Sequence, residues 1–490
     1  MTRRRTKIIA TLGPATDDDG VLASMIEAGL DVVRINLSHG SHEDQQRRAN
    51  QARKVAEQTN QEVGLLADLP GPKIRIEKFQ QSPVQLEPGD QFVLDAGSTD
   101  QAGDENWVGV SYAGLPDDVD DGDVLLLDDG LISMQVESVE QRRIICRVIN
   151  GGSLGDRKGL NVQGGGLSVP GIAEGDIIDI GRAAEMGVDY LAVSFPRNAG
   201  DMQQARKLLR EAGSNAALVA KIERTEAIDN LESIIDASDV VLVARGDLGV
   251  EIGDAALPGL QKRIIRTALA QNRVVITATQ MMQSMIENPV PTRAEVLDVA
   301  NAVIDGTDAV MLSAESAVGQ HPIKVIQAMD RICRGAERHS AEFTPKRILN
   351  VRFQRIDQAI AMAAMFTANN VSVQAIVALT ESGSTARWLS RVRTTVPIFA
   401  LTPNINSRRQ MALFSNVYPV HHRSGANLTT VELAAEAIRH LFDRELLKTG
   451  DRVIFTMGEQ TGTQGGTNTM KLIQVGSDGN SEYQSELNYQ

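Results

Sequence analysis

The chain has 490 residues, more than one compact core usually holds, which predicts two or three domains. A net charge of −14 and an aromatic content of 3% argue against a nucleic-acid-binding protein. Cys146 and Cys333 show no metal-ligand spacing, and no apolar stretch approaches the roughly 18 residues that a membrane span needs. We therefore expect a cytoplasmic protein with neither nucleic acid nor a membrane as partner.

Residues 1–70 alternate between strands and helices. Ser41 opens a predicted helix, with Glu43 and Asp44 in its first turn, where carboxylates favour the helix dipole. Strands are predicted on either side of this helix and near the start of the chain, at residues 6–12, 31–37 and 63–69.

The character of the sequence changes over residues 71–170. This stretch is rich in Gly, Asp and Pro, and its short alternating runs are separated by turn signals such as Pro88-Gly89-Asp90. The pattern predicts a small inserted β-barrel domain. Gly71-Pro72 and Gly164-Gly165-Gly166 lie at its edges and could act as hinges, so we expect this domain to be a lid.

The alternation resumes over residues 171–346. Strands are predicted there at residues 189–195, 218–223, 239–246, 274–281 and 308–313. Together with the three earlier strands they make eight βα units, which favours a closed (β/α)8 TIM barrel over the alternative, an open doubly wound sheet. Residues 347–490 show a further strand and helix alternation and predict a C-terminal α/β domain.

Charged residues follow two neighbouring strands of the predicted barrel. Lys221 and Glu223 are two positions apart and leave one face of their strand together, and Asp247 follows the next strand. Because the carboxyl ends of parallel strands meet at one rim, we expect the three side chains to lie close together. Two carboxylates suit Mg²⁺ or Mn²⁺, and a lysine beside such a metal suits a phosphoryl or enolate oxygen.

Sequence blocks along nearly the whole chain resemble those of the pyruvate kinase family. They are Ile9-Ala-Thr-Leu-Gly-Pro14, Asp31-Val-Val-Arg-Ile-Asn-Leu-Ser-His-Gly40, Gly71-Pro-Lys-Ile-Arg75, Ala220-Lys-Ile-Glu223, Ala244-Arg-Gly-Asp-Leu-Gly-Val-Glu-Ile252, Thr277-Ala-Thr-Gln-Met-Met282, Pro291-Thr-Arg-Ala-Glu295 and Met311-Leu-Ser-Ala-Glu-Ser316. Each block alone is a weak pattern, but the ordered set is specific. The resemblance implies phosphoryl transfer from phosphoenolpyruvate to ADP, giving pyruvate and ATP, as the last step of glycolysis.

The resemblance also assigns roles at the substrate. Glu223 and Asp247 match the divalent-metal ligands, and Lys221 matches the lysine that stabilises the transferred phosphoryl group and the enolate. Arg34 is expected to hold the phosphoryl oxygens, for which the fixed fork of an arginine is suited. The substrate-binding set is completed by Gly246, Asp247 and Thr279. Thr279 and Ser313 are alternative residues for the proton path, and the sequence does not choose between them.

Further matches concern the nucleotide and a regulatory ligand. His39, Arg75 and Lys158 match family residues near the phosphates of ADP or ATP, and closure of the lid would bring Lys158 in. A strand-to-helix turn in the last domain matches the family loop for a phosphorylated allosteric effector, with Thr380, Ser382, Gly383, Ser384 and Thr385. The family is homotetrameric, so we expect a homotetramer.

The site for a monovalent cation departs from the usual family pattern. Asn36, Ser38, Asp68 and the carbonyl of Leu69 match it, but Lys73 stands where the family commonly has glutamate. An ammonium group can place a fixed positive charge where K⁺ would otherwise sit. We therefore expect that K⁺ is not required.

Two alternatives to a kinase share part of this pattern. A magnesium-dependent lyase or aldolase acting on pyruvate or phosphoenolpyruvate would share the metal carboxylates but would need no ADP. A catalytically inactive sugar-phosphate sensor is disfavoured because Arg34, Lys221, Glu223 and Asp247 are all present.

Overall fold

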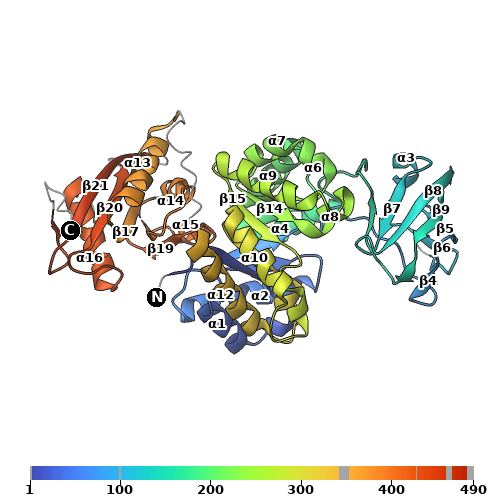
Figure 1. The fold of residues 1–490 in the computed structure, drawn as a ribbon, viewed down its shortest axis with the longest axis horizontal. Coiled ribbons are helices and arrows are strands. Elements are labelled where there is room, and N and C mark those ends of the chain that lie inside the picture. Colours follow the sequence, from blue (N-terminus) through green and yellow to red (C-terminus); the bar gives the residue numbers. More distant parts are fainter. Residues whose placement is uncertain (1–2, 99–100, 341–352, 426–427, 459–465, 483–490) are drawn as a thin grey trace.

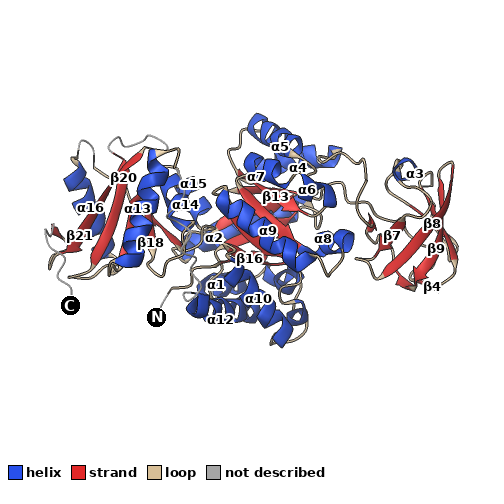
Figure 2. Ribbon diagram, turned by 45° about the horizontal axis from the view of Figure 1, so that its top comes forward, coloured by secondary structure: helices blue, strands red, loops and turns tan. Residues whose placement is uncertain are grey.

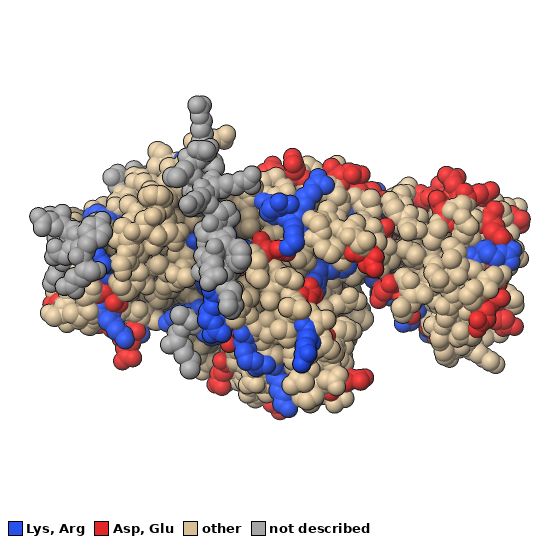
Figure 3. Space-filling view, in the orientation of Figure 1, with Lys and Arg blue, Asp and Glu red and all other residues tan. Residues whose placement is uncertain are grey.

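Three bodies lie in a row in the computed structural model, which describes residues 3–98, 101–340, 353–425, 428–458 and 466–482. The barrel is in the centre, the inserted domain lies at one end and the C-terminal domain at the other (Figure 1). On the face shown in Figure 3, acidic side chains predominate on the inserted domain, while basic and acidic side chains interleave on the barrel. Among the described helices, none is long and apolar enough to cross a bilayer.

Within the described residues, eight parallel strands close the central barrel. They are β1 (Lys7–Thr11), β2 (Val32–Asn36), β3 (Gly64–Asp68), β12 (Tyr190–Val193), β13 (Ala217–Ile222), β14 (Val240–Ala244), β15 (Val274–Ala278) and β16 (Ala309–Leu312). Closure is direct, because β1 pairs with β2 on one side and with β16 on the other. The predicted TIM barrel is confirmed, and the open sheet is excluded.

Helices surround this barrel, as Figure 2 shows. The longer ones are α1 (Asp19–Glu27), α2 (His42–Gln58), α4 (Glu174–Glu185), α5 (Ala199–Glu211), α7 (Leu231–Ala237), α9 (Leu257–Ala270), α10 (Arg293–Asp305) and α12 (Pro322–Ser340). Shorter elements lie at the loops: η1 (Pro14–Thr16), α6 (Thr225–Asp229), α8 (Arg245–Ile252), η2 (Gln283–Ile286) and α11 (Ala314–Ala317). Ser41 caps α2 by accepting a hydrogen bond from the Asp44 amide, as its sequence predicted.

The inserted domain is built on a mainly antiparallel sheet. Its elements are β4 (Val84–Leu86), β5 (Gln91–Asp95), β6 (Trp107–Gly109), α3 (Leu115–Asp118), β7 (Val124–Leu127), β8 (Ile132–Glu140), β9 (Arg143–Asn150), β10 (Gly152–Leu154) and β11 (Leu160–Val162). The main sheet runs β11-β7-β8-β9-β5-β6, in which β5 and β6 pair in parallel, and β4 pairs with β10. Arg75 and Ile76 lie between the two edges of the main sheet. Arg75 forms a single β-bridge with Gly159 beside β11, and Ile76 forms one with Val110 beside β6. This segment therefore closes the small barrel without forming a regular strand.

The C-terminal domain is a mixed sheet with helices. Its elements are α13 (Ile356–Asn370), β17 (Ala375–Leu379), α14 (Ser384–Ser390), β18 (Ile398–Thr402), α15 (Ile405–Met411), β19 (Val417–His421), α16 (Thr430–Asp443), β20 (Arg452–Gly458), β21 (Thr467–Val475) and β22 (Ser481–Glu482). The sheet order is β19-β18-β17-β20-β21-β22. Its apolar core is continuous with barrel residues such as Ile9, Val32 and Leu66. The domain boundary predicted between residues 346 and 347 lies outside the described residues.

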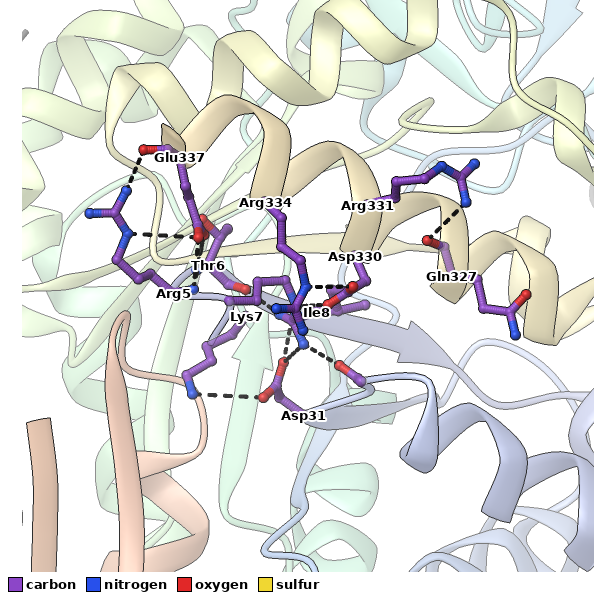
Figure 4. A network of polar contacts seen from close by, with 12 residues as sticks. Arg5, Thr6, Lys7, Ile8, Asp31, Gln327, Asp330, Arg331, Arg334 and Glu337 are labelled. Atoms are coloured by element: carbon purple, nitrogen blue, oxygen red, sulfur yellow. Dashed lines mark hydrogen bonds and ion pairs between the residues drawn. The ribbon is translucent and has the colours of Figure 1, made fainter. Parts of the chain in front are cut away.

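Polar contacts anchor the start of the chain to both neighbouring bodies. Asp31 accepts hydrogen bonds from the Ile8 amide and from Arg4, at 2.8 and 2.9 Å, and Glu337 of α12 accepts one from the Thr6 amide at 2.7 Å (Figure 4). Lys7 Nζ donates to the Val417 carbonyl of the C-terminal domain at 2.7 Å. The first strand therefore connects the barrel to the C-terminal domain, at the end opposite to the carboxyl rim.

Candidate active site

Lys221 lies near the carboxyl end of β13, where oxygen atoms surround its ammonium group. Its Nζ is 3.1 Å from Asp68 Oδ1 and 3.0 Å from Glu223 Oε1, and it donates a hydrogen bond of 2.7 Å to Ser194 Oγ. Burial opposes the charge of Lys221, but the carboxylates of Asp68 and Glu223 outweigh burial and raise its pKa. The structure therefore holds a charged ammonium in a fixed position at the barrel mouth.

Asp68, the last residue of β3, orients Arg34 of the neighbouring strand β2. Arg34 Nε and Nη2 are 2.8 and 2.7 Å from Asp68 Oδ2, and its Nη1 donates to Thr11 Oγ1 at 2.9 Å. Burial alone would raise the pKa of Asp68, but the charges of Lys221 and Arg34 lower it. Asp68 is thus an ionised carboxylate that aligns the two cations expected to meet a phosphoryl group.

The two predicted metal carboxylates lie at the same rim. Glu223 follows β13 and accepts a hydrogen bond from the Phe195 amide at 2.9 Å, and Asp247 lies in the first turn of α8, directly after β14. Burial raises the pKa of Glu223; Lys221 opposes this rise, and the charge of Asp247 adds to it. The two carboxylates are therefore close enough for Asp247 to act on the charge of Glu223.

This donor set fits a hard divalent cation. A cation between Glu223 and Asp247 would relieve their repulsion, and carboxylate oxygens are the ligands that Mg²⁺ and Mn²⁺ prefer. Within the described residues, no cluster of three or more His, Cys, Asp or Glu side chains could hold a metal ion by itself. Water and substrate oxygens would complete the coordination, as is usual for Mg²⁺.

Lys73, at the start of the inserted domain, places its ammonium 2.7 Å from Asp247 Oδ1. Its stem packs on Gly159, where a Cβ would lie 3.0 Å from Lys73 Cε. We expected this ammonium at the monovalent-cation site. Among the described residues it makes no hydrogen bond or ion pair with the residues of that site, which are Asn36, Ser38, Asp68 and Leu69. The physical reason is that Lys221 and Arg34 already neutralise Asp68, whereas Asp247 has its carboxylate free for Lys73.

Among the monovalent-cation residues, Asn36 and Ser38 bond to each other, whereas Leu69 bonds to Ser194. Asn36 Oδ1 accepts a hydrogen bond from the Ser38 amide at 3.1 Å. The Leu69 carbonyl accepts one from Ser194 Oγ at 2.7 Å, and Ser194 in turn accepts from Lys221. Their part in binding a cation stays a prediction.

A strained bend lies beside Asp247. The Gly246 amide donates to Thr279 Oγ1 at 2.9 Å, and Thr279 has a φ of 68°, which a β-branched residue rarely adopts. Arg245 stabilises the bend by donating to the carbonyls of Ala278 and Thr279, at 3.1 and 2.6 Å. Strain of this kind persists where surrounding contacts hold it, and it is common at functional positions. The bend brings Thr279 next to the predicted substrate pocket.

Ser313 lies at the end of the neighbouring strand β16. Its amide donates to Glu315 Oε2 at 2.7 Å, and the Met282 amide donates to Glu315 Oε1 at 3.1 Å, so this buried carboxylate joins the ends of β15 and β16. Among the described residues, no hydrogen bond links the hydroxyls of Thr279 and Ser313. Both remain predictions for the proton path.

The predicted nucleotide residues lie on both sides of the rim. Arg75 and Lys158 are neighbours on the inserted domain, because the Ile76 amide donates to the Lys158 carbonyl at 3.0 Å. Lys158 Nζ is 2.9 Å from Asp128 Oδ1, and Arg75 Nη1 donates to the Arg157 carbonyl at 3.0 Å. His39 follows β2 on the barrel side. Their contacts with a nucleotide stay predictions.

Helix α8 connects the rim to the inserted domain. The Glu251 carbonyl accepts from the Gly164 amide at 3.1 Å, and the Glu251 side chain accepts from the Thr225 amide at 3.0 Å and from Asn161 Nδ2 at 3.4 Å. Burial is the main cause that raises the pKa of Glu251 to about 7. A single helix therefore carries Asp247 at one end and the contact with the predicted hinge at the other.

The predicted effector loop is tightly folded. Thr380 Oγ1 accepts from the Gly383 amide at 3.1 Å, and the hydroxyl of Thr385 is hydrogen-bonded to that of Thr467. Gly383 has a φ of 80°, and a Cβ there would lie 2.9 Å from Met411 Cγ, so this position requires glycine. Ser382 and Ser384 form no side-chain hydrogen bond with any described residue. Ligand binding by this loop stays a prediction.

The sequence did not predict two residues that position other side chains of the site, Ser194 and Arg245. Ser194 lies between Lys221 and the Leu69 carbonyl, and it directly follows β12, so the strand-end rule that indicated Lys221 could have indicated it too. The role of the Arg245 side chain in holding Thr279 had no sequence signal, because it depends on the path of a neighbouring loop.

Comparisons with known proteins agree with this site. The family model for the pyruvate kinase barrel domain matches residues 3–326, and the model for the pyruvate kinase alpha/beta domain matches residues 358–473. The chain is 51% identical to pyruvate kinase II of Salmonella typhimurium over 476 residues, which cover 96% of this chain and 99% of that protein. It is 47% identical to pyruvate kinase of Haemophilus influenzae, with the same coverage.

A solved structure has the same architecture. The crystal structure of a pyruvate kinase from Cryptosporidium parvum superposes with a TM-score of 0.87 and 32% sequence identity, covering 96% of both chains. The two family models together match most of the chain, and the curated relatives named above share about half of its residues along nearly its whole length. This chain therefore belongs to the pyruvate kinase family.

Proposed function

We propose that this chain is a phosphotransferase that moves the phosphoryl group of phosphoenolpyruvate to ADP and releases pyruvate and ATP. The observation that carries the proposal is the position of Lys221, whose charged ammonium is held between Asp68, Glu223 and Ser194 at the carboxyl rim of the barrel. Family membership supports the same reaction.

The residues of this chain would neutralise and align the transferred group. Phosphoryl transfer needs charge stabilisation and in-line placement more than covalent help from the protein. Arg34, aligned by Asp68, would hold the phosphoryl oxygens. Lys221 would stabilise the phosphoryl group during its transfer and also the oxygen of the enolate that is formed. Thr279 or Ser313 would then direct a proton to the enolate carbon.

The metal site we propose uses Glu223 and Asp247. Mg²⁺, or Mn²⁺ in its place, would supply Lewis-acid stabilisation of the substrate oxygens. The amide of Gly246 and the hydroxyl of Thr279, which are hydrogen-bonded to each other at 2.9 Å, border the space beside Asp247 and suit the substrate carboxylate. Closure of the inserted domain as a lid would bring Arg75 and Lys158 towards the ADP phosphates, with His39 on the barrel side.

We propose further that the enzyme needs no K⁺. The support is Lys73, which brings a permanent positive charge to the rim, 2.7 Å from Asp247 Oδ1. An ammonium at this place would supply the positive charge that a monovalent cation would otherwise provide near the substrate.

Regulation and assembly are proposed from the family resemblance. The loop of Thr380, Ser382, Gly383, Ser384 and Thr385 would bind a phosphorylated effector, and the protein would be a cytoplasmic homotetramer. Exposed apolar residues support self-association. Leu297 and Ile304 lie seven positions apart on one face of α10, with 63% and 37% of their surface exposed, and Val290 precedes that helix with 65% exposed.

The function is tested by measuring pyruvate and ATP formed from phosphoenolpyruvate with Mg²⁺, with and without ADP. We expect equal amounts of the two products, and none of either without ADP. A magnesium-dependent lyase or aldolase, which family membership does not favour, would release product from its substrate without ADP. ADP-independent pyruvate release would therefore overturn the proposal.

A further inference from the structure

The loop after β12 orients Glu223, the proposed metal ligand that follows the neighbouring strand β13. Glu223 Oε2 accepts a hydrogen bond from the Phe195 amide at 2.9 Å, and Oε1 is 3.0 Å from Lys221 Nζ. A carboxylate oxygen can accept two hydrogen bonds, so each oxygen keeps one lone pair for a cation. The Phe195 amide and Lys221 together therefore fix the direction in which the carboxylate faces.

Phe195 has a backbone conformation that a residue with a side chain rarely adopts. Its φ is 56°, in the left-handed region that favours glycine. Such a conformation persists only where the surrounding contacts hold it. The direction of the Phe195 amide, and with it the hydrogen bond to Glu223, therefore depends on what packs against the buried Phe195 side chain.

Arg224 packs over the face of the Phe195 ring. Its Cζ lies 5.2 Å from the ring centroid, within the distance of about 6 Å at which a cation is attracted to an aromatic ring. Arg224 is only 3% exposed, and its Nη1 is buried without a hydrogen-bond partner among the described residues. Packing on the ring therefore holds a guanidinium that has no fixed ion pair of its own in the described part of the chain.

The backbone of Arg224 has a fixed base. Arg224 directly precedes α6, and the amide of the next residue, Thr225, donates to Glu251 Oε2 of α8 at 3.0 Å. Burial is the main cause that raises the pKa of Glu251 to about 7, and the charge of Arg224 is among the causes that oppose this rise. Arg224 is therefore positioned by the same helix that carries Asp247 in its first turn.

The hinge of the inserted domain also packs against the loop after β12. A Cβ at Gly71 would lie 2.6 Å from Ser194 Cβ and 3.0 Å from Phe195 Cδ2, so only glycine leaves room for these side chains. Asp176 of α4 holds the hinge by accepting a hydrogen bond from the Gly71 amide at 3.0 Å. Phe195 therefore contacts both the hinge and the proposed metal ligand.

We propose that Arg224 is a positioning residue for the divalent cation: it holds the Phe195 ring, and the Phe195 amide then keeps the carboxylate of Glu223 turned towards the cation. The inference rests on the proposed role of Glu223 as a metal ligand. Residues that orient a metal ligand from behind affect metal affinity although they do not touch the ion.

The test is a titration of the full-length protein with Mn²⁺, followed by electron paramagnetic resonance without nucleotide. We expect Arg224→Met to weaken Mn²⁺ binding by about 10-fold, as is usual when support for a metal ligand is lost. An effect of charge alone has the opposite sign, because removing a positive charge near the site would strengthen the binding of a cation. Unchanged or tighter Mn²⁺ binding by Arg224→Met would overturn the inference.

Two further variants accompany this change. Arg210→Met is the matched control, because Arg210 is exposed on α5 and its removal changes the net charge equally, so this variant should bind Mn²⁺ like the wild type. Arg224→Lys should bind Mn²⁺ more tightly than Arg224→Met, because an ammonium also packs over an aromatic ring. If Arg224→Met does not fold, Arg224→Lys provides the comparison with the wild type, and an Mn²⁺ affinity of Arg224→Lys below that of Arg224→Met would contradict the inference.

A double-mutant cycle tests the path through Phe195. Phe195→Leu removes the ring but keeps the amide that bonds to Glu223. We expect Phe195→Leu to weaken Mn²⁺ binding, and Arg224→Met to weaken it little further in that background, because the stacked ring is already absent. Additive effects of the two changes would show that Arg224 acts by another route and would contradict the inference.

Steady-state kinetics separate positioning from a general structural role. Arg224→Met should need about 10-fold more Mg²⁺ for half-maximal turnover, whereas kcat at saturating Mg²⁺ should stay close to that of the wild type, because a bound cation restores the orientation of Glu223. A lower kcat that excess Mg²⁺ does not correct, together with unchanged Mn²⁺ affinity, would show that Arg224 is a structural residue and would contradict the inference.

Glu223→Gln distinguishes a failure of this inference from a failure of the proposed metal site. If Glu223→Gln weakens Mn²⁺ binding and Arg224→Met does not, Glu223 is a ligand that needs no support from Arg224, and the inference alone fails. If neither variant weakens Mn²⁺ binding, the cation lies elsewhere, and the proposed role of Glu223 fails as well.

Discussion

At the scale of single residues, the account depends on the charge of Lys221. The ammonium is held by Asp68, Glu223 and Ser194 at the carboxyl rim of the barrel. We expect Lys221→Met to reduce kcat by at least about 10²–10³-fold, because a preorganised stabiliser of the phosphoryl group and enolate is removed. The affinity for phosphoenolpyruvate, measured by isothermal titration calorimetry, should be largely retained.

Lys54→Met is the control for this change. Lys54 pairs with Asp19 on the exposed surface of α2, far from the rim, so its removal should leave kcat unchanged. Full turnover in Lys221→Met would show that another residue stabilises the transferred group.

A second residue-scale prediction concerns Lys73 and potassium. The wild type should be equally active in buffers of K⁺ and of tetramethylammonium, because Lys73 supplies a fixed positive charge at the rim. Lys73→Glu should lose most of its activity without K⁺ and recover part of it when K⁺ is added. A many-fold increase in wild-type activity on adding K⁺ would refute the proposed role of Lys73.

The sequence was sufficient to bring Lys221, Glu223 and Asp247 to one rim, because strand ends of a parallel barrel share an edge. It was not sufficient for their partners. The contact of Lys73 with Asp247 depends on how the inserted domain meets α8, and the contact of Ser194 with Lys221 depends on the register of neighbouring strands. Both contacts depend on the tertiary structure, which no local sequence pattern specifies.

At the scale of elements, Glu251 of helix α8 should make the free energy of unfolding depend on pH. The pKa of Glu251 is raised to about 7 in the folded protein from an ordinary value of 4.5. A carboxyl group with a raised folded pKa stabilises the fold fully below its unfolded pKa, and this stabilisation is lost as pH rises through the folded value. The loss between about pH 4.5 and pH 7 amounts to roughly 3 kcal/mol at most.

The variant Glu251→Gln should remove this dependence. We expect its thermal midpoint, relative to that of the wild type, to be higher at pH 8 than at pH 5.5, since the glutamine is neutral at both. Glu232→Gln, on the exposed side of α7, should show no such difference. Parallel pH profiles of Glu251→Gln and the wild type would mean that Glu251 does not titrate in this range.

Element boundaries were predictable only in part. The strand predicted at residues 63–69 is β3 (Gly64–Asp68), one residue shorter at each end, and the capped start of α2 at Ser41 followed from its local signals. The strand expected to extend to Gly246 instead ends at Ala244, because Arg245 begins α8 and turns its side chain to the carbonyls of Ala278 and Thr279. Packing against the neighbouring loop decided that boundary.

At the scale of the whole molecule, a buried ion pair joins the C-terminal domain to the barrel. Arg391 donates to Asp308 Oδ2 at 2.9 Å, and side-chain exposure is 5% for Arg391 and 1% for Asp308. Asp308 also accepts from the amides of Val275 and Ser415. We expect Asp308→Ala to destabilise the protein by about 3–5 kcal/mol in urea unfolding, because Arg391 would stay buried without its partner.

Asp236→Ala provides the comparison, since that carboxylate pairs with Arg273 at the surface with 84% of its side chain exposed. Exposed ion pairs contribute about 0–1 kcal/mol, so this variant should unfold nearly like the wild type. Similar losses for Asp308→Ala and Asp236→Ala would show that the buried pair does not hold the two domains together.

Assembly is the second whole-molecule prediction. The apolar face of α10, defined by Leu297 and Ile304 with Val290 beside it, should be covered by a second copy of the chain. We expect Leu297→Glu to lower the molecular mass measured by sedimentation, because burial of an added carboxylate is costly. An unchanged mass would place the contacts between copies on another surface.

The central claim is that Glu223 and Asp247 together hold the divalent cation beside Lys221. The most direct measurement is a titration of the full-length protein with Mn²⁺, followed by electron paramagnetic resonance in the absence of nucleotide. The wild type should bind Mn²⁺ more tightly than Glu223→Gln and Asp247→Asn, by about 10-fold or more for each. If both variants bind Mn²⁺ as tightly as the wild type, the metal lies elsewhere and this account of the active site is wrong.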